Sequence, residues 1–336
     1  MHDLHHPGVA MKLQRIEHFI AVAEAGSIRG AARHLDMSQP ALTRSIQQLE
    51  QDLGVQLMHR GIGGSSLTPA GRAFLARAQL AQSELIKAAE EARQGFNDVT
   101  GLATFGMSPV GVSLLMPELL TTLRGQHPGL RMRVLENAPS PLLQMVREGT
   151  AELAVTQRTR ANLDAGLKYR PLFDIQLRIA ARPGHPLAGT RSLPELAQCA
   201  WLAQTAPGIA DDITRQSFLA LGLPAPAPAI HWGSFFGGVF DLIATTDIVT
   251  TLPPQLLRTL VASGKLIEIP LTKPLVPLRV GLYTRADSPP SLATKAATQI
   301  IVAIARRYAA SADLRDTAPF SGPGDAKQKK RVKRIG

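Results

Sequence analysis

The chain has 336 residues, of which 45% are apolar, 19% charged and 4% aromatic, and it carries a formal net charge of +11. This length is enough for about two domains, and the apolar fraction excludes a chain that is disordered throughout. The single cysteine, Cys199, excludes an intramolecular disulfide and a cysteine-based zinc site.

The net positive charge is unevenly distributed along the chain. Residues 1–96 contain ten Lys and Arg residues against nine Asp and Glu, and residues 97–320 contain 21 against 16. The last sixteen residues contain six against one and show no apolar periodicity. We expect residues 313–336 to form a disordered basic tail, which is either simply solvated or attracted to a phosphate backbone.

The sequence gives no sign of a membrane or metal site. Two long uncharged stretches, residues 99–117 and 216–240, contain Gly and Pro residues, so neither could cross a bilayer as an uninterrupted helix. Residues 1–10 lack the cationic and apolar segments of a secretory signal. Their histidines His2, His5 and His6 lack further ligands at helical spacing. We therefore expect a soluble, cytoplasmic protein without a bound metal.

Three short helices are predicted between residue 11 and Gly54. Gly26 ends the first helix, Ser27 can cap the second, and Ser38 can cap the third, with Pro40 in its first turn. The short break at residues 36–37 makes the second and third helices a helix-turn-helix. The apolar positions at helical spacing, which we expect to be buried, are Ile16, Phe19, Ile20, Ala23, Ile28, Ala31, Ala32, Leu35, Leu42, Ile46, Leu49 and Leu53.

The outward face of the third helix is polar and carries Gln39, Thr43, Arg44, Gln47 and Gln48. Gln and Arg are the side chains that read adenine and guanine edges in the major groove of DNA. An ordinary three-helix packing module with a polar outer face would show the same pattern, so both interpretations stay open at this point.

The segment after the third helix favours the DNA-binding interpretation. A short apolar run at 55–59, turn-forming residues at 60–66 and Leu67 predict a β-hairpin wing. Thr68 and Pro69 then open a long helix that continues to about residue 95. Its apolar seam predicts pairing with a second copy, which would place two recognition helices on neighbouring turns of DNA. The seam residues are Phe74, Ala78, Ala81, Leu85, Ala88 and Ala92.

Beyond residue 100, short apolar runs alternate with helical patterns, which predicts an α/β domain with a largely parallel sheet. The predicted strands are 103–107, 131–135, 153–156, 176–181, 230–232, 247–251, 266–269 and 279–283. The predicted helices lie near 110–124, 140–148, 209–221, 236–244, 254–262 and 290–309.

Residues 12–77 resemble the LysR-type transcriptional regulators, in the motifs Gly26-Ser27, Ser38-Gln39-Pro40-Ala41-Leu42-Thr43, Leu49-Glu50 and Leu67-Thr68-Pro69-Ala70-Gly71. The resemblance continues more weakly through Gly106-Met107-Ser108-Pro109 and His185-Pro186-Leu187. It implies a winged helix-turn-helix at 11–68, a linker and dimerisation helix at 69–96 and an effector-binding domain at 97–312. That last domain would have the two-lobed fold of type 2 periplasmic binding proteins, with lobe one at 100–172 and 271–312 and lobe two at 173–270.

The resemblance also implies roles for individual residues. Gln39, Pro40, Thr43 and Arg44 would face the DNA bases, with Gln47 on the same face of the helix, and Arg60 would hold the phosphate backbone from the wing. Two features depart from the family pattern: Met58 stands where Phe is usual, and the wing is glycine-rich with one arginine.

In the implied two-lobed fold, ligands sit between the lobes, at strand carboxyl ends and helix N-termini. The candidate effector-binding residues at such places are Ser108, Ser140, Gln157, Thr205, Ser234 and Phe235. Each of the polar ones could instead only cap its own backbone. A weaker likeness of the wing to the branch that includes galactose-binding-protein and aromatic-sulfonate regulators favours a sugar, a sugar acid or an aromatic acid as effector.

Two other classes of function fit the sequence less well. An enzyme would need a reactive constellation, whereas the chain shows no Gly-rich phosphate loop, HExxH motif or nucleophile elbow. A solute-binding protein without a DNA role would account for residues 100–312 alone. We therefore expect a transcriptional regulator, acting as a homodimer or homotetramer, whose partners are promoter DNA, RNA polymerase and a small-molecule effector, with no cofactor.

Overall fold

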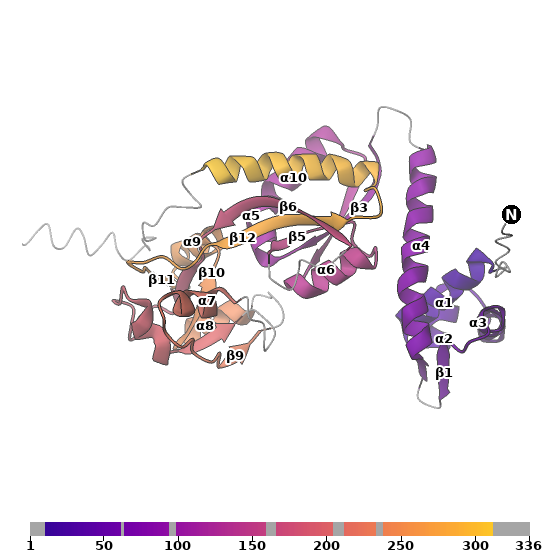
Figure 1. The fold of residues 1–336 in the computed structure, drawn as a ribbon, viewed down its shortest axis with the longest axis horizontal. Coiled ribbons are helices and arrows are strands. Elements are labelled where there is room, and N and C mark those ends of the chain that lie inside the picture. Colours follow the sequence, from indigo (N-terminus) through magenta and orange to yellow (C-terminus); the bar gives the residue numbers. More distant parts are fainter. Residues whose placement is uncertain are drawn as a thin grey trace, which may run out of the picture. The chain divides into compact units, whose positions relative to one another are not determined.

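The computed structural model describes residues 11–61, 64–93, 99–158, 166–203, 212–232 and 238–311. They form two compact units, of which the first contains the elements α1 to α4 and the second contains β3 to α10 (Figure 1). Within these ranges, no helix combines the length and the apolar character that crossing a bilayer requires.

The first unit begins with the three predicted helices, α1 (Leu13–Ala25), α2 (Ile28–His34) and α3 (Gln39–Leu53). The predicted caps are confirmed: the Ser27 hydroxyl accepts a hydrogen bond from the Gly30 amide at 3.1 Å, and Ser38 accepts one from Ala41 at 3.3 Å. Gly26 and Gly54 end α1 and α3 with φ angles of 63° and 65°, a left-handed conformation that Gly adopts without strain. Phe19, Val22, Ala31, Leu42, Ile46 and Leu49 form the buried core of this unit.

The hairpin lies slightly later in the chain than predicted. Its antiparallel strands are β1 (Met58–Gly61) and β2 (Gly64–Leu67), with Met58 opposite Leu67. The predicted strand start at Val55 is wrong because the Val55 amide still donates to the Glu50 carbonyl at the end of α3, and its side chain is 43% exposed. The long helix α4 (Pro69–Arg93) follows as predicted.

The second unit contains two five-stranded sheets. The first has the order β4-β3-β5-β12-β6 and the second the order β11-β7-β10-β8-β9. The strands of the first are β3 (Gly101–Met107), β4 (Leu130–Glu136), β5 (Leu153–Gln157), β6 (Leu167–Ile175) and β12 (Leu278–Arg285). Those of the second are β7 (Arg178–Ala181), β8 (Ala200–Ala203), β9 (Ile230–His231), β10 (Ile248–Leu252) and β11 (Ile267–Ile269).

The expectation of a largely parallel sheet is wrong for both sheets. In the first, β3 pairs in parallel with β4 and β5, whereas β12 pairs antiparallel with β5 and β6. In the second, β10–β8 and β8–β9 are parallel, whereas β7 pairs antiparallel with β10 and β11. The antiparallel strands are those by which the chain leaves the first sheet, through β6 to β7, and returns to it, through β11 to β12.

Six helices of the second unit lie close to their predicted positions. They are α5 (Pro109–Gln126), α6 (Pro139–Arg147), α7 (Ile213–Ala220), α8 (Gly238–Thr245), α9 (Pro254–Ala262) and α10 (Leu292–Ala310). The short 3-10 helix η2 (Leu193–Gln198) and the strands β6 and β8 were absent from the prediction. The first sheet also extends to Ile175, which pairs with Leu278, and thus beyond residue 172, where the sequence suggested that its lobe ends.

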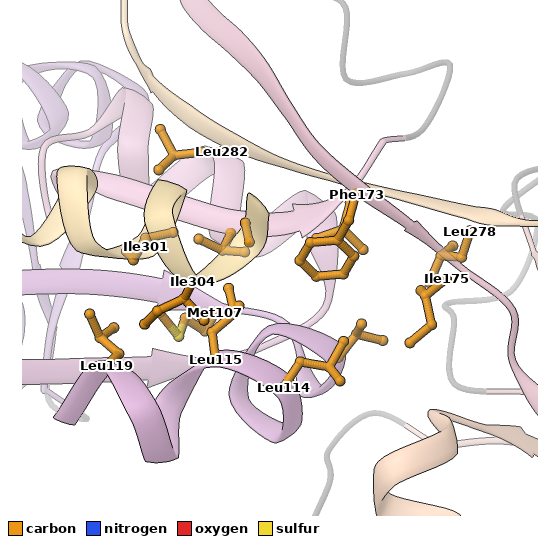
Figure 2. Packing of buried hydrophobic residues seen from close by; sticks show 14 of the residues in the cluster. Met107, Leu114, Leu115, Leu119, Phe173, Ile175, Leu278, Leu282, Ile301 and Ile304 are labelled. Atoms are coloured by element: carbon orange, nitrogen blue, oxygen red, sulfur yellow. The ribbon is translucent and has the colours of Figure 1, made fainter. Parts of the chain in front are cut away.

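The core of the second unit lies where α5 and α10 pack on one face of the first sheet. Figure 2 shows Leu115 and Leu119 of α5 and Ile301 and Ile304 of α10 gathered near Met107 of β3. On the opposite face, α6 covers the sheet with Leu142, Leu143 and Val146 against Tyr283 (Figure 1). Burying one such aliphatic side chain stabilises the fold by about 1.5–3 kcal/mol. Because several are buried on each face of the first sheet, its strand ends have well-defined positions.

Candidate functional site

The predicted recognition surface lies on the N-terminal half of α3. Gln39, Pro40 and Arg44 are exposed and Thr43 and Gln47 are half-buried, whereas Leu42, Ile46 and Leu49 of the same helix are buried. The Thr43 hydroxyl donates to the Gln39 carbonyl at 2.9 Å, so its proton is already used within α3. An exposed Arg beside Gln and a threonine methyl group can contact guanine, adenine and thymine respectively.

Polar contacts hold α3 against α1. His18 Nδ1 lies 2.7 Å from the Ser45 hydroxyl, and Arg15 of α1 forms an ion pair with Asp52 of α3. The Gln48 side-chain amide donates to the same Asp52 carboxylate at 3.2 Å. Gln48 is exposed, as predicted, and this bond directs its amide toward Asp52.

The wing is anchored to the recognition helix by Glu50. Its carboxylate accepts hydrogen bonds from the backbone amides of Leu57 at 2.8 Å and Met58 at 3.1 Å, where the chain enters β1. Arg60, the predicted phosphate contact, lies in β1 with its backbone paired to Ser65. No role was predicted for Glu50, although an acidic residue late in an amphipathic helix, just before a strand, is a recognisable anchor for free amides.

The start of α4 packs directly on the entry to the wing. The Thr68 hydroxyl donates to the Gln56 carbonyl at 2.8 Å and accepts from the Gly71 amide at 2.9 Å, which caps α4. A Cβ atom at Gly71 would lie 1.9 Å from the Leu57 carbonyl oxygen. Glycine is therefore required at this position, because any side chain would push α4 away from the wing.

In the second unit, three of the predicted effector residues lie at one edge of the first sheet. Because β3, β4 and β5 are parallel, their carboxyl ends meet at this edge, where α5 and α6 begin. Ser108 lies directly after β3, Ser140 lies in the first turn of α6, and Gln157 ends β5. Thr205, Ser234 and Phe235 lie outside the described residues.

The three described residues differ in their surroundings. Ser108 is fully buried and caps α5, with its hydroxyl accepting from the Gly111 amide at 3.4 Å. Ser140 is exposed and lies inside α6 rather than before it, because Pro139 already takes the first helical position. The Gln157 side-chain oxygen accepts from the Thr156 hydroxyl at 3.2 Å. At the same edge, partial burial raises the pKa of Glu136, the last residue of β4.

Two further polar groups follow strands of the second sheet and were not predicted. Trp232 follows β9, and Gln255 lies in the first turn of α9, after β10. Within the described part of the chain, the indole N–H of Trp232 and the side-chain amide of Gln255 are buried without a hydrogen-bond partner. The sequence pattern predicts Trp232 as the end of a strand. Gln255 follows two prolines, and these prolines predict the start of a helix but do not indicate a binding group.

Comparison with known proteins identifies both units. A family model described as a bacterial regulatory helix-turn-helix protein of the lysR family matches residues 13–72. A second, described as a LysR substrate binding domain, matches residues 97–306. Each match covers most of one unit.

Similar proteins match over nearly the whole length. The HTH-type transcriptional regulator PcaQ of Agrobacterium fabrum is 28% identical over 84% of this chain and 91% of its own. The SDS degradation transcriptional activation protein of a Pseudomonas species is 31% identical over 86% of this chain and 95% of its own. The crystal structure of full-length CbnR complexed with its target DNA has the same fold, with a TM-score of 0.65, 20% identity and coverage of 88% of this chain and 99% of that one.

Proposed function

The chain belongs to the LysR family of transcriptional regulators, and we propose that a small-molecule effector controls how it binds and bends one specific promoter sequence. It is a regulator and not an enzyme, because the matching family models and the similar proteins are those of transcriptional regulators. In this proposal residues 11–68 bind DNA, residues 69–96 pair with a second copy, and residues 97–312 bind the effector. The chain passes from one proposed lobe to the other at the β6–β7 and β11–β12 connections, and residues 313–336 are the proposed basic tail.

The DNA-binding proposal depends mainly on the polar face of α3. Gln39, Thr43, Arg44 and Gln47 share this face, and Glu50 and Thr68 hold the wing and α4 beside it. Arg60 is proposed to contact a phosphate from the wing. Side chains on rigid, capped helices can contact base edges with defined geometry, and this is the arrangement that helix-turn-helix proteins use.

The experiment that tests DNA recognition selects binding sites from a pool of random duplexes and compares the selected duplex with a scrambled one by gel shift at ~0.15 M salt. We expect Arg44→Ala to weaken binding to the selected duplex by about 1–3 kcal/mol and to the scrambled duplex far less. Equal losses on both duplexes would make Arg44 a phosphate contact. Failure to select any sequence would refute the function.

The effector proposal assigns Ser108, Ser140 and Gln157, with Thr205, Ser234 and Phe235, to a site between the lobes. Trp232 and Gln255 join them as candidates because each offers buried, unpaired polar atoms beyond a strand end. A thermal-shift screen of sugars, sugar acids and aromatic acids tests this site. A true effector should lose affinity in Gln255→Ala; an unchanged affinity would exclude Gln255 from the site.

Effector binding is proposed to close the lobes and so change the spacing of the DNA-binding pairs in a cytoplasmic dimer or tetramer. The resulting bend would alter access of RNA polymerase to the promoter. A ligand can shift such an assembly only by its differential affinity for the two arrangements. Footprints and DNA bending that are identical with and without the effector would refute this mechanism.

A further inference from the structure

A surface pocket of about 370 Å³ opens in the second unit, between α10 and the β6–β12 pair. Leu282 pairs with Arg170 and Thr284 pairs with Lys168, so these four side chains share the sheet face toward α10. Pockets that hold small organic molecules have volumes of about 300–1,000 Å³. The pocket is therefore large enough for one small ligand.

The rim of the pocket is positively charged. Lys168 and Arg170 of β6 and Lys295 of α10 are exposed lining residues, and no acidic residue lines the pocket. In the described part of the chain, these three cations form no recorded ion pair, in contrast to Arg178, which pairs with Glu268 at 2.8 Å. The rim can therefore attract and hold an anionic group.

Two acidic residues of the described chain, Glu152 and Asp287, are engaged with other groups next to this part of the fold. Glu152 accepts two hydrogen bonds from Ser291, both at 3.0 Å, at the start of α10. Asp287 lies 3.3 Å from the Arg285 guanidinium. These carboxylates therefore have partners other than Lys168, Arg170 and Lys295, and the positive charge of the rim is available to a ligand.

The interior of the pocket combines apolar surface with one unused hydroxyl. Leu282 and Pro290 contribute apolar lining, and Thr298 of α10 also lines the pocket. Among the described residues, the Thr298 hydroxyl oxygen is buried without a hydrogen-bond partner. A buried hydroxyl without a hydrogen-bond partner destabilises the fold, and a hydrogen bond to an acceptor on a ligand would offset that cost. The pocket thus offers apolar contact, a hydroxyl donor and three cations.

We propose that this pocket binds a small organic anion in which a carboxylate or sulfonate is joined to an apolar body. The anionic group contacts Lys168, Arg170 and Lys295, and the apolar body lies against Leu282 and Pro290. This site lies between α10 and β6. Strand β6 is one edge of the first sheet and β4 is the other, and the site is separate from the strand-end site that contains Ser108. It gives the regulator a second ligand site in addition to the effector site.

Calorimetric titration of the full-length protein with biphenylcarboxylate tests the proposal. We expect Lys168→Gln/Lys295→Gln to weaken binding about tenfold, as loss of charge-assisted hydrogen bonds does. The matched control, Lys273→Gln/Arg306→Gln, removes the same charge from two other exposed positions and should bind like the wild type. Ser108→Ala should also bind like the wild type, because it changes only the strand-end site.

Two further probes test the chemical class of the ligand. Neutral biphenylmethanol and inorganic phosphate should each bind about tenfold more weakly than biphenylcarboxylate, because each lacks one half of the recognised chemistry. The proposal is overturned if biphenylcarboxylate does not bind, if the pocket variant binds it as tightly as the control variant, or if Ser108→Ala abolishes binding. It is also overturned if the alcohol or phosphate binds as tightly as the carboxylate.

Discussion

Replacing Gly71 by alanine tests how the first unit holds its wing. In the first turn of α4, a Cβ atom at Gly71 would lie 1.9 Å from the Leu57 carbonyl oxygen and 2.9 Å from its carbonyl carbon. The obstructing atoms belong to the backbone, so no rotamer change relieves the clash. To restore an ordinary contact of 3.4 Å, α4 must move by about 1.5 Å (3.4 − 1.9).

Such a movement breaks the bonds that join α4 to the wing entry. The Thr68 amide donates to the Leu57 carbonyl at 3.0 Å, and the Thr68 hydroxyl donates to the Gln56 carbonyl at 2.8 Å. Loss of two such bonds costs about 2 kcal/mol, and residual overpacking adds about 1–2 kcal/mol. We therefore expect Gly71→Ala to destabilise the first unit by about 3 kcal/mol.

Hydrogen exchange of the full-length protein is the assay that isolates this effect. Every Trp and Tyr residue lies beyond residue 168, so intrinsic fluorescence reports only the second unit. Amides of α1 to α3 should exchange about a hundredfold faster in Gly71→Ala, since each 1.4 kcal/mol corresponds to about tenfold. Fluorescence-detected unfolding of the second unit should not change.

A matched variant separates the clash from the general effect of replacing glycine. Gly125 lies in α5, and a Cβ atom there meets no atom within 4 Å. Gly125→Ala should leave stability unchanged or raise it by up to about 1 kcal/mol, because Ala favours helix. If exchange of α1 to α3 in Gly71→Ala stays within about twofold of the wild type, the close packing of α4 on Leu57 does not hold the unit together.

Two further substitutions and one reactivity measurement test other parts of the structure. Glu50→Ala should weaken binding to the selected duplex about tenfold, because it frees two wing amides, and Glu50→Gln should lose less; equal losses would contradict the anchoring role. Glu152→Ala should lower the stability of the second unit by about 1–3 kcal/mol, measured by Trp fluorescence, because Ser291 loses its two bonds to Glu152; an unchanged stability would contradict this. Burial, with a smaller contribution from Asp247, raises the pKa of Cys199, so the thiol should react slowly with iodoacetamide at neutral pH and faster as the pH rises. A rate equal to that of free cysteine at neutral pH would contradict this reasoning.

The helix-turn-helix could be predicted from sequence because its signals are local. Ser27 and Ser38 cap helices whose apolar residues are only three or four positions apart, so a short window contains the whole pattern. The exposed face of α3 follows from the same periodicity. Gln48 is exposed, as that periodicity predicts, but periodicity does not contain the partner of a polar side chain, here the Asp52 carboxylate.

The sheet topology of the second unit could not be predicted in the same way. The edge strand β6 was missed because Lys168, Arg170, Pro171 and Asp174 interrupt its apolar pattern, and such residues are typical of strands with one unpaired side. Its pairing with β12 joins residues more than a hundred positions apart. Strand direction depends on such distant pairs, so short windows favoured a parallel sheet where half of the pairings are antiparallel.

The same limit applies to the strand-end site. Ser108, Ser140 and Gln157 were predicted because each follows or precedes an apolar run. Gln255 and Trp232 were missed because what distinguishes them is a buried polar atom without a partner, and only the packed structure reveals it. Sequence patterns thus located the elements around the candidate site but only some of its side chains.

The small net charge of the first unit limits how it can bind DNA. With ten basic residues against nine acidic ones over residues 1–96, non-specific attraction to phosphates is weak for one copy, so affinity depends on positioned contacts and on pairing. In α4, the Phe74 ring packs on Phe19 with 5.5 Å between centroids, whereas Leu85 and Ile86 are 51% and 53% exposed. A second copy that covers Leu85 and Ile86 would double the base contacts, while residues 1–96 of that copy would add a net charge of only +1 (10 − 9). If α4 pairs as proposed, we expect this pairing to contribute more to specific binding than the overall charge of +11 does.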